Sequence, residues 1–180
     1  MYTSNRIHVA TIAVIAAAAC SVQPPAAKPP ALGAAVSAEE VARWDISIPP
    51  SGAGLPPGSG SVKEGEAVYA AKCESCHGPK GAGKPADALV GGVGSLATAK
   101  PVRTVGSYWP YATTLFDYTR RAMPITSPLS LSNDEVYAVT AYVLFVNGIV
   151  SADATMNAQS LPAVKMPNRD GFVSDWPPRR

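Results

Sequence analysis

The sequence predicts a small all-α domain flanked by Pro- and Gly-rich extensions. Two Ser-x-x-Glu capping boxes, Ser61 with Glu64 and Ser132 with Glu135, each open a segment of good helix formers. The 18 prolines of the 180-residue chain lie mostly outside these segments, where regular helix is not expected. The length suits one domain with extensions rather than two ordinary domains.

The first 32 residues are expected to serve export and spacing. A short polar start and an apolar run over residues 9–19, too short to span a bilayer, predict a signal peptide over residues 1–19. Cys20 follows four alanines, which fits either a lipoprotein box with a lipidated Cys20 or ordinary cleavage nearby. Residues 20–32 are Pro- and Ala-rich and predict a linker. The expected location is periplasmic, with a membrane anchor only through Cys20.

The charge of the chain gives no reason to expect a nucleic-acid partner. Lysine and arginine number 15 against 13 acidic residues, so the formal net charge is +2. A basic patch strong enough to attract nucleic acid or an acidic membrane would need a larger excess. We therefore expect no nucleic acid among the partners.

Residues 33–60 are expected to be an N-terminal extension that packs on the domain. Ser37 with Glu40 predicts a short helix running towards Trp44, whose indole is expected to pack on the core. Residues 49–60 are a proline and glycine loop that is expected to cross the domain surface.

The central domain is expected over residues 61–150 and contains three predicted helices. The first covers residues 63–72, where Gly65 predicts close approach of another helix. The second opens at Pro110 and runs to about Ala122, before Pro124 stops it. The third covers residues 132–147, with valines at three- and four-residue spacing that predict a buried face. Residues 151–180 are predicted to form an extended tail.

The motif Cys73-Glu-Ser-Cys76-His77 is the stretch with the most specific chemistry. CxxCH is typical of c-type haem attachment, in which both thiols form thioethers to the porphyrin and the histidine ligates iron. A zinc site would need four ligands, yet outside the motif only Cys20 and His8 remain, both near the signal segment. A redox-active dithiol would need a βαβ context, which the neighbouring sequence does not predict. The expected cofactor is one covalently bound haem c.

The second axial ligand is expected to be a methionine, because His77 is the only histidine after residue 19. The candidates are Met123, Met156 and Met166. We favour Met123, because the following Pro124 stiffens the loop after a helix, and Met166 is the alternative. His/Met ligation fills both axial positions, which suits electron transfer and leaves no site for oxygen or peroxide.

Three further residues are candidate haem contacts. Trp109 precedes the second predicted helix, and Arg120 and Arg121 lie at its end. The arginines would meet haem propionates or a protein partner, although a solvated surface position is the default for both.

The sequence resembles the class I c-type cytochromes, and within them the cytochrome subunits of bacterial sulfite dehydrogenase and of the Sox sulfane dehydrogenase, over roughly residues 33–175. The resemblance rests on residues 44–46 (Trp-Asp-Ile), 54–60 (Gly-Leu-Pro-Pro-Gly-Ser-Gly), 91–92 (Gly-Gly), 108–110 (Tyr-Trp-Pro), 120–124 (Arg-Arg-Ala-Met-Pro) and 166–172 (Met-Pro-Asn-Arg-Asp-Gly-Phe). It implies a class I cytochrome c fold with Met123 as an axial ligand. It also implies a molybdenum-cofactor dehydrogenase subunit as the electron donor.

The expected function is electron transfer, with no catalysis by this chain alone. Electrons from a molybdenum sulfite or sulfane dehydrogenase would pass through the haem to a downstream cytochrome or oxidase. The alternatives are the cytochrome subunit of another periplasmic dehydrogenase, such as an alcohol dehydrogenase, and a haem peroxidase or sensor. The lack of a second histidine argues against the peroxidase, and carbon monoxide binding to the reduced protein would distinguish a sensor from an electron carrier.

Overall fold

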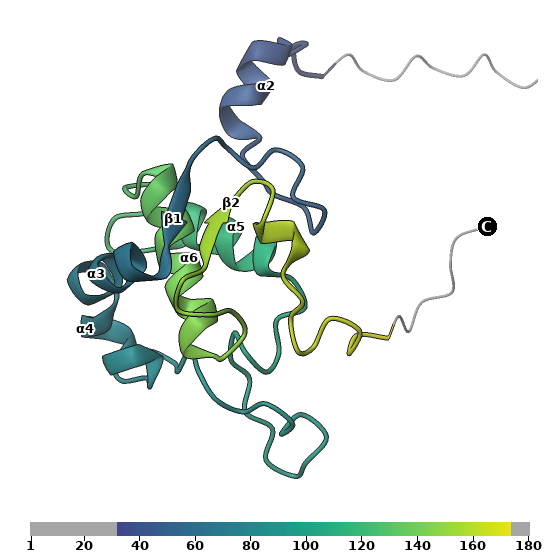
Figure 1. The fold of residues 1–180 in the computed structure, drawn as a ribbon. Helices are drawn as coiled ribbons and strands as arrows, with labels where there is room; N and C mark the ends of the chain where they lie inside the picture. Colours follow the sequence, from purple (N-terminus) through teal and green to yellow (C-terminus); the bar gives the residue numbers. More distant parts are fainter. Residues whose placement is uncertain (1–31, 174–180) are drawn as a thin grey trace, which may run out of the picture. The chain divides into compact units, whose positions relative to one another are not determined.

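A computed structural model describes residues 32–173 of the chain. The predicted signal peptide, Cys20 and the linker up to residue 31 lie outside the described residues, as does the end of the tail. The described part contains five α-helices, one two-stranded sheet and two 3-10 turns (Figure 1). Their bounds are α2 Ala38–Trp44, β1 Ser59–Ser61, α3 Val62–Lys72, α4 Glu74–His77, η1 Pro79–Gly81, α5 Ala112–Ala122, α6 Asn133–Val146, β2 Thr155–Asn157 and η2 Leu161–Ala163. None of these helices is both long and apolar enough to cross a membrane.

The chain divides into two compact units, Met1–Val41 and Ala42–Arg180, with the boundary inside α2. Helix α2 begins after Ser37, whose Oγ accepts a hydrogen bond from the Glu40 amide at 3.1 Å, as the capping box predicts. The expectation for Trp44 is wrong, because its side chain is 79 % exposed. Aromatic side chains of other helices fill the core, and the seven-residue α2 buries none of its own residues.

Helix α6 is the centre of the larger unit and confirms the strongest sequence prediction. Ser132 and Glu135 form the predicted reciprocal capping box, and Asn147 is the C-cap. Every residue from 136 to 144 is buried. A helix that is buried on all sides must be covered by neighbours; α3, α5 and the sheet pack against it, and Figure 1 shows it between α3 and α5.

The crossing of α3 and α6 depends on Gly65, as predicted. A Cβ at this position would overlap the backbone carbonyl of Ala138, which cannot move without distorting α6. One turn later, the rings of Tyr69 and Tyr142 lie 5.1 Å apart and tilted by 43°. Glycine therefore lets the two helix backbones meet, and the tyrosine pair fills the space beside them.

Helix α5 begins at Ala112 with Tyr111 as its N-cap, so Pro110 precedes the helix instead of opening its first turn. Leu115 and Phe116 lie on the buried face of α5. The Phe116 ring packs on Tyr137 of α6 with 4.5 Å between the ring centroids. This contact fixes α5 on α6.

The proline and glycine loop before β1 crosses the domain surface, as predicted. The Ile48 amide donates to Oδ1 of Asp117 at 2.9 Å, and the Tyr137 hydroxyl donates to the Pro56 carbonyl at 2.8 Å. The Ser59 amide donates to Oδ1 of Asp134 at 2.8 Å. Side chains of α5 and α6 thus satisfy backbone groups of a segment that has few hydrogen bonds of its own.

Part of the predicted extended tail forms regular structure. Residues of β2 pair antiparallel with β1, with Gly60 opposite Met156, and η2 follows. Each strand has only three residues, which is too few for an alternating sequence pattern to indicate a strand. Gly60 is required at this pairing, because a Cβ there would overlap the Ala138 backbone.

Candidate haem site

The two cysteines and the histidine of the CxxCH motif lie on a single turn. Helix α3 ends at Lys72, and Cys73 caps it while starting α4. The amides of Cys76 and His77 both donate to the Cys73 carbonyl, at 3.1 and 3.0 Å. All three side chains line one cavity of about 330 Å³. We call this turn, together with the loop over residues 83–89, the attachment wall.

The His77 ring is oriented by a backbone carbonyl. Its Nδ1 lies 2.9 Å from the Asp87 carbonyl oxygen. Because a carbonyl can only accept, this contact requires the proton on Nδ1 and leaves the Nε2 lone pair available to a metal. The loop that follows the motif thus provides the acceptor for the His77 ring.

The loop that carries the Asp87 carbonyl is bonded to the motif itself. The Gly83 amide donates to the His77 carbonyl at 2.6 Å, and the Ala86 amide donates to the Cys76 carbonyl at 2.8 Å. The Leu89 amide reaches the Gly81 carbonyl at 2.8 Å. The attachment wall is therefore one hydrogen-bonded unit, built from consecutive stretches of chain.

Burial raises the pKa of two groups on this side of the cavity, Tyr69 and Cys73. Burial raises the pKa of the Tyr69 phenol to about 12, so the phenol stays protonated and donates to the Gly78 carbonyl at 2.8 Å. Burial also raises the pKa of the Cys73 thiol to about 11, while the neighbouring Lys72 lowers it in part. Both groups are neutral at pH 7, as suits the wall of an apolar cavity.

The second wall of the cavity, which we call the α5 wall, consists of Trp109 and the lining residues of α5 and of the turn after it: Leu115, Tyr118, Thr119, Met123, Pro124, Ile125 and Thr126. Met123 is the C-cap of α5, and its amide donates to the Thr119 carbonyl at 3.0 Å. The backbone of Met123 is extended, so the chain leaves the helix direction at this residue. Met123 also lines the cavity. Trp109 and Tyr118 meet edge to face, with ring centroids 5.7 Å apart. Met123 thus shares a cavity with His77.

The lining of the cavity fits a covalently held porphyrin. A covalently attached haem c needs two thiols, at least one strong axial donor and an apolar enclosure. The attachment wall supplies the thiols and the imidazole, and the α5 wall supplies a thioether. The remaining lining is largely apolar and includes Leu89, Val105, Trp109, Leu115, Tyr118, Pro124, Ile125, Val139 and Val143.

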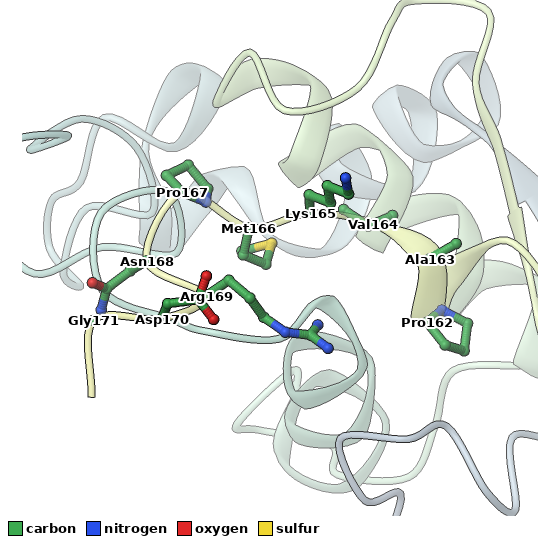
Figure 2. Close-up of a pocket in the computed structure, with 10 residues that line it drawn as sticks. All are labelled: Pro162, Ala163, Val164, Lys165, Met166, Pro167, Asn168, Arg169, Asp170 and Gly171. Atoms are coloured by element: carbon green, nitrogen blue, oxygen red, sulfur yellow. The ribbon is translucent and has the colours of Figure 1, made fainter. Parts of the chain in front are cut away.

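The other methionines lie elsewhere. Met166 is 3 % exposed and lines a separate hollow of about 580 Å³ formed by residues 162–171 (Figure 2). Met156 lies in β2 with its side chain in the core. Neither lines the cavity that contains His77, so the geometry favours Met123 over both.

Arg120 and Arg121 are directed away from the cavity. Arg121 forms an ion pair with Asp117, one turn earlier on α5, and this pairing raises the pKa of its guanidinium. Arg120 Nη1 lies 3.5 Å from the Ile46 carbonyl. Neither lines the cavity, so the structure gives no support to haem contacts from these two arginines. Trp109, the third candidate contact, does line it.

Sequence analysis missed several cavity residues. Tyr118 follows Leu115 by three residues on α5, so helical spacing could have placed the two together. Pro124 and Ile125 follow the predicted ligand Met123 directly, and nothing in the pattern assigned them to the cavity. Ile125 is 73 % exposed, so the cavity rim presents an apolar side chain to the surface.

Two comparisons with known proteins find a similar domain or chain. A family profile described as "Cytochrome C oxidase, cbb3-type, subunit III" matches residues 60–143. A chain in the crystal structure of the sulfane dehydrogenase SoxCD from Paracoccus pantotrophus is similar, with 43 % sequence identity and a TM-score of 0.76. The similarity covers 82 % of this chain and 73 % of that chain. A search of curated protein sequences finds no match.

Proposed function

This chain belongs to the class I c-type cytochromes and is a relative of a sulfane dehydrogenase chain, and on that premise we propose that it is a mono-haem electron-transfer subunit. Cys73 and Cys76 would hold the porphyrin by thioethers, and His77 and Met123 would ligate the iron. One observation carries the proposal: these four side chains line the same cavity.

The residues of the site would hold the haem in one position while its iron is oxidised and reduced. Haem c supplies a one-electron couple at iron. His77 is held in one tautomer by the Asp87 carbonyl, so its Nε2 is presented as a donor. Met123 would fill the remaining axial position, which excludes small ligands and limits the site to electron transfer. The apolar side chains that line the cavity would exclude water from the haem.

We propose that the chain is exported to the periplasm and accepts electrons from a molybdenum-cofactor dehydrogenase of sulfur oxidation. The support is the similarity to a chain of sulfane dehydrogenase SoxCD. Oxidation of the sulfur compound would take place on the partner subunit, and the electrons would leave to a downstream cytochrome or oxidase. The rim of the cavity offers a place for electron exchange, since Tyr118 and Ile125 line the cavity and are 45 % and 73 % exposed.

The ligand assignment is tested with Met123→Ala in the haem-loaded protein. The variant should lose the far-red sulfur-to-iron absorption band, fall in reduction potential and bind carbon monoxide when reduced, because a thioether ligand raises the potential and closes the sixth position. Met166→Ala removes a buried methionine outside the cavity and is the matched control. An unchanged spectrum in Met123→Ala would contradict the assignment. Rapid and complete binding of carbon monoxide by the unaltered protein would favour a peroxidase or sensor.

The choice of partner is tested by purification of the complex from its native host. Co-purification with a molybdenum-containing subunit that reduces this haem on addition of a sulfur substrate is the expected result. Reduction by a quinoprotein alcohol dehydrogenase would instead support the other periplasmic role.

A further inference from the structure

The Asp87 carbonyl orients His77, and the structure indicates what in turn holds the loop that carries this carbonyl. The bonds from Gly83, Ala86 and Leu89 all end within residues 76–81. They connect the loop to the motif, and the Tyr69 hydroxyl of α3 in turn bonds the motif at the Gly78 carbonyl. None of these bonds joins the loop itself to α6.

Asn147 supplies such a bond. Its Nδ2 donates to the Leu89 carbonyl at 3.1 Å and to the Val143 carbonyl at 2.9 Å. The second bond, to the residue four positions earlier, holds the side chain against its own helix, of which Asn147 is the C-cap. The two protons of one amide group thus join the end of α6 to the loop, two residues from Asp87. Apart from the His77 contact with Asp87, no other side-chain hydrogen bond of the described residues joins residues 83–89 to a helix.

The side-chain amide of Asn147 also packs closely against the backbone of Gly106. Gly106 lies so close that a Cβ there would overlap the Oδ1 and Cγ of Asn147. Gly106 does not have a positive φ, so glycine is needed here because a side chain would not fit, and not because of the backbone conformation. The turn that contains Gly106 is fixed in turn, because Thr104 Oγ1 donates to the Gly91 carbonyl at 2.6 Å. Val105 of the same turn lines the cavity.

The orientation of this amide follows from its neighbours. Both nearby partners of Nδ2 are carbonyls, which accept only, so a flipped amide would set its oxygen against two acceptors. Oδ1 is buried with no hydrogen-bond partner in the protein. A buried acceptor without a partner is costly, and an apolar side chain of similar size would avoid that cost. The donor side of the amide is therefore the reason to have asparagine here.

We propose that Asn147 is a positioning residue for the axial histidine: it fixes the Asp87 loop to α6 and so sets the strength of the hydrogen bond at His77 Nδ1. This inference rests on the proposed function, in which His77 ligates iron. A stronger hydrogen bond at Nδ1 gives the imidazole more anionic character, favours oxidised iron and lowers the reduction potential. Asn147 would therefore hold the potential down without contacting the haem.

The experiment compares Asn147→Leu with the unaltered haem-loaded protein. We expect the His77 Nδ1 proton to exchange with water about tenfold faster, the factor that corresponds to loss of one hydrogen bond. The reduction potential should rise, with the far-red band retained because Met123 is not affected. Asn133→Leu is the matched control, since Asn133 donates to the Pro57 carbonyl at 3.3 Å from the other end of α6.

A second variant keeps the test informative if Asn147→Leu does not fold. In Gly106→Ala the asparagine remains, but the new Cβ pushes its amide away from Leu89, so the same two changes are expected at smaller size. Unchanged exchange and potential in either folded variant would overturn the inference. If the unaltered protein showed no haem-shifted His77 ring signals, the proposed ligation by His77 would fail instead, so the two failures are distinguishable.

Discussion

The two walls of the cavity are built in different ways. The attachment wall is local: its thiols, its imidazole and the carbonyl that orients the imidazole come from 15 consecutive residues, Cys73 to Asp87. The α5 wall depends on tertiary packing, because Met123 and Trp109 reach the cavity only when α5 packs on α6 through Phe116 and Tyr137. The difference suggests that loss of covalent attachment and loss of ligand control are separable defects.

The largest expected effect comes from the attachment wall. In the double variant Cys73→Ser with Cys76→Ser, both thioethers are impossible, so haem should be fully extractable under denaturing conditions. Mass spectrometry of the denatured chain checks this, since the unaltered protein should retain the mass of haem. Cys20→Ser removes a cysteine outside the motif and should leave attachment intact. Covalent haem in the double variant would contradict the assignment of this wall.

A smaller effect is expected at the crossing of α6 with α3, the helix that leads into the attachment wall. Gly65→Ala places a Cβ against the Ala138 backbone, which costs more than the gain in helix propensity returns. We expect a loss of about 1–2 kcal/mol in the free energy of unfolding. Denaturant unfolding of the haem-loaded protein measures it.

The neighbouring exposed residue provides the control for Gly65. Glu66→Ala, on the same helix, should change the free energy of unfolding by less than about 0.5 kcal/mol. Equal stability of Gly65→Ala and Glu66→Ala would show that the crossing of α3 and α6 tolerates a side chain, against the packing described above.

The smallest effect is expected on the outer face of the α5 wall. Arg121→Gln removes the ion pair with Asp117, and because Arg121 is 46 % exposed the loss of stability should be about 1 kcal/mol or less. The absorption spectrum and the reduction potential should not change, since Arg121 does not line the cavity. A marked shift in potential would restore the predicted haem contact and extend the α5 wall to this arginine.

Much of the fold follows from local sequence. The predicted all-α class and class I cytochrome c fold are confirmed. The boundaries of α3 and α6 were predictable because a capping box satisfies specific amides at specific positions, at Ser61 and Ser132. Where the preference is less specific, the prediction was less accurate, and α5 begins two residues after Pro110.

What sequence analysis missed depends on contacts between distant residues. The β1–β2 pair is too short for a periodic pattern. Trp44 is apolar and large, yet nothing local shows that the core is already filled. Asn147 could be recognised only as a residue near a helix end, because its partner Leu89 lies far away in the sequence. A residue that positions another residue through a contact distant in sequence is therefore the hardest kind to recognise from the local sequence pattern.

The pairing of β1 with β2 also has a consequence for the order of folding. Ser59 lies opposite Asn157, so nearly the whole haem-binding region is enclosed between two strands of three residues. Closing so long a loop is slow compared with forming the helices inside it. Helices α3 and α6 can therefore associate before the strands pair, and the ladder closes only when residues 155–157 reach β1. A chain truncated before β2 would keep its haem-binding motif but leave the edge of β1 open to pairing with other chains.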